Sequence, residues 1–235
     1  MDIGRDPRMP MHLKREIEAL KRRLLGLCAL LEEAVRQAVR SVENRDGELA
    51  RRVIEGDTAI DRVEVEVEEE CLKILALHQP VAGDLRFIVI CLKINNDLER
   101  MGDLAVNIAE RAEFLASEPP VNVPFDFPTM AEKAQAMVKN SLDALVNLDA
   151  ALAREVCKAD DEVDAINREM YGQIKKAIRE QPECLDQLIH LLGIARHLER
   201  IADLATNIAE DIIYMVEGEI VRHYAENYGA GAKKD

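Results

Sequence analysis

The sequence predicts an all-α protein of two tandem three-helix bundles, that is, six long antiparallel helices forming an internal repeat. Aromatic residues make up 3% of the 235 residues and apolar residues 48%, so the core consists mainly of Leu, Ile, Val and Ala, which favours helices over strands. The 11 Gly and 8 Pro are too few for a turn-dense sandwich or barrel. Apolar residues also recur in long runs at steps of three and four, which is the spacing of amphipathic helices.

The first half of the chain contains three of these runs, separated by short breaks that contain Gly or Pro. They predict helices over residues 12–44, 48–78 and 84–117. The first run shows the apolar stripe most clearly, at Ile17, Leu20, Leu24, Leu27, Leu31, Val35 and Ala38. At about 1.5 Å per residue each helix is roughly 45 Å long, and helices of matched length with short connections form an antiparallel bundle.

The second half repeats this organisation after a segment with four prolines and no helical period. Its periodic runs predict helices over residues 129–148, 149–180 and 182–221. We therefore divide the chain into a first three-helix repeat, a proline-rich linker and a second three-helix repeat with a short tail, at residues 1–118, 119–128 and 129–235.

The two halves are related by sequence as well as by pattern. Residues 98–110 return as residues 198–210 with 10 of 13 positions identical, and residues 49–61 match residues 152–164 at 6 of 13 positions. Because both matches link equivalent helices of the two halves, the chain is two copies of one unit.

Acidic residues recur four positions apart in all four repeated segments. On a helix this spacing places two carboxylates on one face, one turn apart, where they repel each other unless a cation lies between them. In the third and sixth helices an Asn and a further Glu continue the stripe, and an Asn amide oxygen can ligate a hard cation. The candidate metal ligands are Asp57, Asp61, Glu99, Asp103, Asn107 and Glu110 in the first repeat, and Asp160, Asp164, Glu199, Asp203, Asn207 and Glu210 in the second.

The numbering of the acids predicts that the pairs face each other. In two antiparallel helices, the numbers of facing residues add to a constant. If the acid pairs face each other, the turn of the first hairpin is centred on Pro80 and that of the second between Gln181 and Pro182. Both positions coincide with a Gln-Pro break found independently from the helical pattern, so we expect four carboxylates at one level of each hairpin.

Oxygen-rich clusters of this kind suit iron, manganese, magnesium or calcium, and bridging carboxylates can hold more than one metal. The alternative interpretation is a solvated acidic face, because the acids lie nearly opposite the core stripe and could pair with the neighbouring Arg100 and Arg200. The recurrence of the motif in four segments with matching hairpin positions favours metal.

Charge and cysteine content narrow the class of protein further. A net charge of −14 repels the phosphate backbone, so we expect no nucleic-acid binding. No apolar run reaches the length of a membrane helix, and the first residues contain no signal-peptide core. The five cysteines show no Cys-x-x-Cys spacing, which is typical of core residues in a reducing compartment, and we expect a cytoplasmic protein.

The sequence contains none of the common catalytic motifs. The Glu-x-x-His pairs of ferritin-like di-metal enzymes, a Ser/Cys–His arrangement, a phosphate-binding Gly-rich loop and a Rossmann fingerprint are all missing. We therefore expect a protein that is not an enzyme.

The repeats resemble the PhoU family of regulators of phosphate-specific transport. The similarity rests on an acid-x-x-x-Asp motif in the second helix of each repeat and Glu-Arg-x-x-Asp-x-x-x-Asn-Ile-x-Glu in the third. The stretch 78–86, HQPVAGDLR, is also similar to the turn between helices in that family. The resemblance covers residues 12–223 and includes all four acidic motifs.

The resemblance implies a cytoplasmic, non-catalytic negative regulator of phosphate uptake and phosphate-starvation signalling. It also implies multinuclear iron, or sometimes zinc, at the acidic motifs. The implied partners are the ATPase subunit of the phosphate ABC transporter and a sensor histidine kinase, so the protein would reach the membrane only through them. We also expect a homodimer. Two alternatives stay open: a carboxylate-bridged multinuclear metal enzyme, and a helical adaptor that functions without metal.

Overall fold

The computed structural model describes residues 11–121 and 126–218, and these residues form six α-helices and one short 3-10 helix without a strand. The predicted all-α fold is therefore confirmed. The elements are α1 (Met11–Asn44), α2 (Gly47–His78), α3 (Ala82–Ser117), α4 (Phe127–Asn147), α5 (Ala150–Glu180), the 3-10 helix η1 (Pro182–Cys184) and α6 (Leu185–Glu217).

The helices begin within a few residues of the predicted starts, and capping side chains or prolines determine the starts of α2, α4, α5 and α6. Asp46 and Asp149 cap α2 and α5, since each side chain accepts a hydrogen bond from a backbone N–H in the first turn. Helix α4 begins at Phe127 because Asp126 caps it and Pro128 fits the first turn. Pro182 starts a 3-10 turn, so α6 begins only at Leu185. The predicted end at residue 221 lies outside the described residues.

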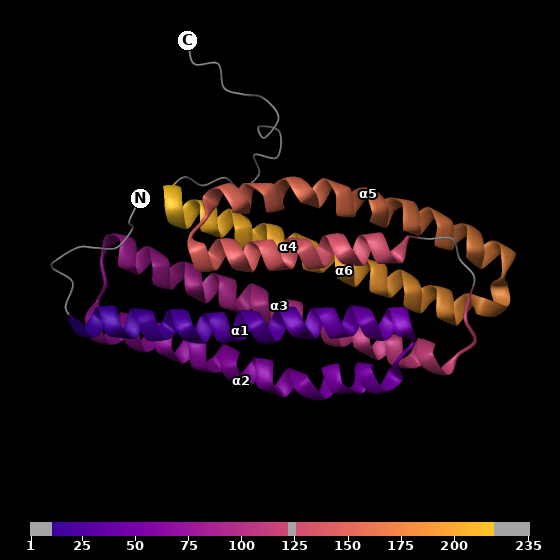
Figure 1. Ribbon diagram of the computed structural model, residues 1–235, viewed down its shortest axis with the longest axis horizontal. Coiled ribbons are helices and arrows are strands. Elements are labelled where there is room, and N and C mark those ends of the chain that lie inside the picture. Colours follow the sequence, from indigo (N-terminus) through magenta and orange to yellow (C-terminus); the bar gives the residue numbers. More distant parts are fainter. Residues whose placement is uncertain (1–10, 122–125, 219–235) are drawn as a thin grey trace, which may run out of the picture.

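The six helices pack as two layers that share one core (Figure 1). Helices α1, α2 and α3 form the first repeat and α4, α5 and α6 the second, and α3 lies along α6 where the repeats meet. A single cluster of buried apolar side chains extends through all six helices. The two bundles are therefore joined by a common hydrophobic core as well as by the chain.

Helix α3 contributes the stripe that the periodicity predicts. Its core residues are fully buried, and they are Ile94, Leu98, Met101, Ala105 and Ile108. Their repeat equivalents in α6 are buried too. Burial of a Leu or Ile side chain contributes on the order of 1.5–3 kcal/mol, so this pair of stripes is a major stabilising element.

A buried ion pair crosses the junction between the repeats. Lys93 Nζ in α3 donates to both carboxylate oxygens of Asp211 in α6, at 2.6 and 2.8 Å, and Asp211 is 2% exposed. A buried carboxylate needs such a partner, so this pair fixes the register of α3 against α6.

Two expectations from the sequence concern the placement of the cysteines and the apolar length of the helices. Of the five cysteines, all free, Cys28, Cys71 and Cys91 are buried and the other two half-buried. None of the helices in the described part of the chain has a stretch long and apolar enough to cross a membrane.

Candidate metal centre

The α2–α3 hairpin places the first acid pair of α2 against the acids of α3. Gly102 marks this contact, because a Cβ atom on it would lie 3.6 Å from Asp57 Oδ1 and 3.4 Å from Ile60 Cγ2. Since Gly102 precedes Asp103, the Asp57 carboxylate lies at the level that the hairpin numbering predicts. A side chain at position 102 would narrow the space available to the acids, and the equivalent residue of the second repeat is the small Ala202.

The acids of the first repeat perturb each other electrostatically. Burial raises the pKa of Asp57, and the charges of Asp61, Asp103 and Glu99 raise it further. The pKa of Glu99 is also raised, first by burial and then by Asp103, with a smaller contribution from Asp61. The four carboxylates, from two helices, are thus close enough for their charges to interact.

The second repeat contains the same arrangement on α5 and α6. Burial raises the pKa of Asp160 to about 6, with further contributions from Asp203 and Asp164. The pKa values of Glu199 and Asp203 are raised as well, mainly by burial and then by the neighbouring acids. The two hairpins therefore concentrate acidic side chains at equivalent places, and the charge of Arg200 offsets part of the rise in the pKa values of Glu199 and Asp203.

These acids are more buried than a fully solvated face would be. Asp57, Glu99, Asp160, Asp164 and Glu199 are half-buried, because each lies beside the neighbouring helix of its hairpin. The remaining acids of the quartets, Asp61, Asp103 and Asp203, are exposed.

Arginine neutralises these clusters only in part. The nearest carboxylate to the Arg100 guanidinium is that of Asp97, at 3.9 Å. Arg100 therefore forms no direct ion pair with Glu99, although its charge acts to lower the pKa of that carboxyl. On the second repeat, Arg168 Nη1 reaches Asp164 Oδ2 at 3.3 Å, in an exposed pair. Exposed pairs of this kind contribute little.

The Asn and the additional Glu of each motif lie farther along the helices. Asn107 Nδ2 donates to the backbone oxygen of Asp103 at 2.7 Å, and Glu110 is exposed. Asn207 and Glu210 line a polar groove between the repeats, together with Lys93 and Arg100 from α3. In this conformation the structure brings the acid pairs together but directs Asn107 to its own helix.

Sequence reasoning missed two residues beside the first cluster. Asn95 Nδ2 donates to Glu64 Oε1 at 2.8 Å and to the Glu64 backbone oxygen at 3.1 Å. Burial raises the pKa of Glu64, and Glu68, Glu99 and Asp61 raise it further. The run of acids that continues from Asp61 along α2 was the available signal. In the second repeat the position of Glu64 is taken by Asn167, so the two clusters differ in charge.

The donor set fits a hard cation, but the side chains are not in ligating positions. Across residues 11–121 and 126–218, no three His, Cys, Asp or Glu side chains converge closely enough to hold a metal ion. Neighbouring carboxylates repel each other in the absence of a cation, which disfavours a convergent arrangement. Carboxylate oxygens on two facing helices can bridge metals once their side chains turn inward.

The raised pKa of Asp160 predicts a pH dependence of stability. Its value of about 6 in the folded protein exceeds the ordinary 3.8, so between about pH 4 and 6 the folded state binds more protons than the unfolded state. Protonation of Asp160 therefore contributes to the free energy of unfolding at low pH, and this contribution is lost as the pH rises through 6. We expect Asp160→Asn to raise the free energy of unfolding of the metal-free protein, relative to the wild type, more at pH 7 than at pH 4. Urea unfolding with a chelator present measures this.

The control for this prediction is Glu162→Gln. The Lys133 ammonium donates a hydrogen bond to the Glu162 carboxylate and lowers its pKa, so the wild-type pair contributes stability that is lost as the pH falls. Glu162→Gln removes this ion pair and should therefore destabilise the protein more at pH 7 than at pH 4, the opposite of the pH dependence expected for Asp160→Asn. Equal effects of Asp160→Asn at both pH values would contradict the assignment.

Comparisons with known proteins agree with the repeated fold and the repeated motifs. A family model described as the PhoU domain matches residues 24–112 and 127–212. The chain is 42% identical over 213 residues to a phosphate-specific transport system accessory protein PhoU homologue from Aquifex aeolicus, covering 91% of this chain and 96% of that protein. It is 37% identical over 209 residues to the homologue from Pseudomonas aeruginosa, covering 88% and 86%.

Solved structures give the same result. The crystal structure of PhoU from Pseudomonas aeruginosa superposes with a TM-score of 0.84 at 36% identity, covering 88% of this chain and 99% of that one. The phosphate transport system regulatory protein PhoU from Streptococcus pneumoniae superposes with a TM-score of 0.78 at 29% identity, covering 89% and 99%. Two matched domains, relatives along nearly the whole chain and the same six-helix fold lead to one conclusion: this chain belongs to the PhoU family.

Proposed function

We propose that this protein is a non-catalytic, metal-binding regulator of phosphate uptake and phosphate-starvation signalling. It acts in the cytoplasm between the ATPase subunit of a phosphate ABC transporter and a phosphate-sensing histidine kinase, and it keeps the phosphate regulon repressed when phosphate is plentiful. Membership of the PhoU family supports this proposal, as do relatives named accessory proteins of phosphate-specific transport systems. We further propose that it functions as a homodimer and contacts the membrane only through its partners.

The observation that carries the metal proposal is the pair of facing acid quartets. The first consists of Asp57, Asp61, Glu99 and Asp103, and the second of Asp160, Asp164, Glu199 and Asp203. Within each, burial and neighbouring charges raise the pKa values of several members. A bound cation removes this repulsion, so metal binding and stability of the hairpins are coupled. Multinuclear iron fits such a set, and zinc, manganese, magnesium and calcium are the other candidates.

The remaining motif residues belong to the same proposal. Asn107 and Glu110 lie one and two turns beyond the first quartet, and Asn207 and Glu210 hold the equivalent positions in α6. A change of rotamer would bring their oxygens toward the metals.

The partner proposal predicts salt-sensitive binding. A chain of net charge −14 attracts basic patches, and such contacts weaken with ionic strength. We expect the purified protein to bind the transporter's nucleotide-binding subunit and the cytoplasmic part of the kinase at low salt, and about tenfold more weakly after a several-fold increase in salt. Biolayer interferometry with each immobilised partner measures this, and failure to bind either one at low salt would contradict the proposal.

A further inference from the structure

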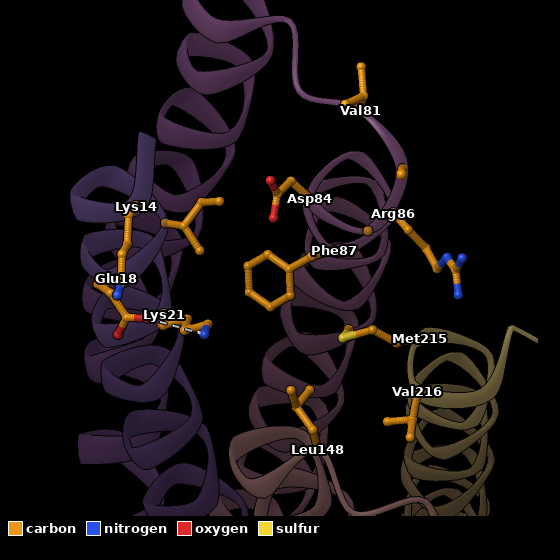
Figure 2. A pocket seen from close by; sticks show the side chains of 13 residues that line it. Lys14, Glu18, Lys21, Val81, Asp84, Arg86, Phe87, Leu148, Met215 and Val216 are labelled. Atoms are coloured by element: carbon orange, nitrogen blue, oxygen red, sulfur yellow. Dashed lines mark hydrogen bonds and ion pairs between the residues drawn. The ribbon is translucent and has the colours of Figure 1, made fainter. Parts of the chain in front are cut away.

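A cleft lies at the end of the bundle where α1 begins and α6 ends (Figure 2). It encloses about 420 Å³ and lies between the first three turns of α1, the α2–α3 turn, the residue that follows α4, and the last turn of α6. This volume is within the range of ligand pockets and accommodates one or two large side chains.

The middle of the cleft is apolar. Figure 2 shows the Phe87 ring between α1 and α6, with the Met215 thioether and Leu148 beside it. Val216 of α6 and Ile17 of α1 complete the apolar lining. Such a surface binds an aromatic or large aliphatic side chain.

Cations flank this apolar centre on two sides. Lys14 and Lys21 extend from α1, and Arg86 lies on the opposite side of Phe87 (Figure 2). Lys21 pairs with Glu18 at 3.3 Å and lies 5.4 Å from the centre of the Phe87 ring. Arg86 lies 5.7 Å from the centre of the Tyr214 ring.

The two outer cations of the cleft are Lys14 and Arg86. Among the described residues, neither Lys14 nor Arg86 has a carboxylate within ion-pair distance, although Glu18 and Asp84 also line the cleft. In a chain with 45 acidic and 31 basic residues, carboxylates are in excess. Two cations at a concave surface, with no carboxylate partner among residues 11–121 and 126–218, therefore favour an acidic ligand.

The internal repeat supplies a comparison, because the second repeat cannot form this cleft. Helix α1 has 34 residues and α4 only 21, so the part of α1 that carries Lys14 and Lys21 has no counterpart. The equivalents of Arg86 and Phe87 are Asp186 and Gln187, which reverse the charge and remove the ring. Within the described part of the chain, the second repeat thus offers no counterpart of this cleft.

The backbone at the mouth of the cleft is strained. Gln79 and Ala82 have positive φ angles of 45° and 50°, a conformation that costs free energy in residues other than Gly and is concentrated at functional sites. Between them, Val81 is 75% exposed at the edge of the cleft. The turn thereby presents an apolar side chain to solvent beside the cations.

We propose that this cleft binds a partner protein through an acidic segment whose aromatic or large aliphatic side chain inserts next to Phe87. Acidic residues on both sides of that anchor pair with Lys14 and Arg86. The proposal rests on the proposed function only in assigning the segment to one of the two partners, the nucleotide-binding subunit or the kinase. It adds a cationic recognition site to a chain whose remaining surface attracts basic partners.

The test uses the full-length protein and both purified partners. The variant Lys14→Glu/Arg86→Glu reverses the charge of the two outer cations, and Arg52→Glu/Lys175→Glu applies the same change in net charge at exposed positions elsewhere. We expect the cleft variant to bind one partner about tenfold more weakly than the control variant. If binding depends only on the acidic surface, the cleft variant binds as well as the control or better, and the proposal is wrong.

A second variant removes the concern that Arg86→Glu disturbs the fold. Val81→Asp changes a residue that is largely exposed and keeps every cation, yet it places a carboxylate where the acidic segment must enter. We expect weaker binding of the same partner with an unchanged thermal melting curve. Undiminished binding by Val81→Asp would also overturn the proposal.

Crosslinking identifies the occupant directly. A photo-crosslinking residue in place of Val81 should capture the partner at a segment that combines Asp or Glu with an aromatic or large aliphatic residue, as read by mass spectrometry. Capture of residues 219–235 of the same chain, or of a second copy of it, would contradict the proposal. If the wild-type protein binds neither partner, the proposed function fails together with the cleft; if wild type binds and the cleft variants bind equally well, only the cleft proposal fails.

Discussion

A strain that lacks this protein is expected to express its phosphate-starvation genes fully when phosphate is plentiful. If the protein transmits the state of the transporter to the kinase, its removal leaves the kinase without its repressing input. Expression in the deletion strain at high phosphate should therefore equal that of the wild type under starvation. A reporter fused to a phosphate-starvation promoter measures this in both strains at high and low phosphate.

Two controls make this result interpretable. Restoring the wild-type chain from a plasmid should return repression, and the transporter must remain intact, because its loss would itself starve the cell. Normal repression in the deletion strain with a working transporter would show that this PhoU-family member does not regulate the response. Restoring a chain without the acidic motifs tests whether repression needs the metal sites. A metal-independent adaptor would still repress the genes without them.

The double substitution Glu99→Ala/Asp103→Ala should remove about half of the bound metal, because the two acid clusters are separate and similar. Glu99 and Asp103 contribute two of the four carboxylates of the first quartet, and no cluster in the second repeat includes them. The fold should survive, since substitutions of exposed or half-buried acids usually cost no more than about 0.5 kcal/mol. Inductively coupled plasma mass spectrometry on protein purified without chelator gives the metal content per chain.

A matched control is Glu169→Ala/Glu180→Ala, which removes two exposed acids of α5 outside both clusters. It should retain the wild-type metal content. Glu199→Ala/Asp203→Ala should remove the other half, and the combination of both double substitutions should remove nearly all. Unchanged metal content in Glu99→Ala/Asp103→Ala would show that these acids are not ligands.

Much of the fold can be predicted from the sequence because helices have a period and proline interrupts it. The stripe from Ile94 to Ile108 is buried as its spacing requires. The register of the hairpins could also be predicted, because the connections at Pro80 and Pro182 are short and leave little freedom in how the helices align. The contact between Asp57 and Gly102 has the predicted register.

Other features depend on packing that a one-dimensional pattern does not contain. The buried pair of Lys93 and Asp211 joins residues 118 positions apart, and its register is determined by how the two repeats dock. The acids were expected nearly opposite the core, whereas the helices beside them leave several half-buried. The cleft around Phe87 arises because α1 is longer than α4 and because four separate segments meet at one end of the bundle.

Whether the two carboxylate clusters hold metal can be measured on the purified protein. The wild-type protein, purified without chelator, is analysed by inductively coupled plasma mass spectrometry beside the variant in which Glu99, Asp103, Glu199 and Asp203 are all changed to Ala. We expect more than one metal ion per wild-type chain, with iron the leading element, and almost none in the variant. Equal metal content in the two proteins, or none in the wild type even after incubation with iron, zinc, manganese, magnesium and calcium, would contradict it.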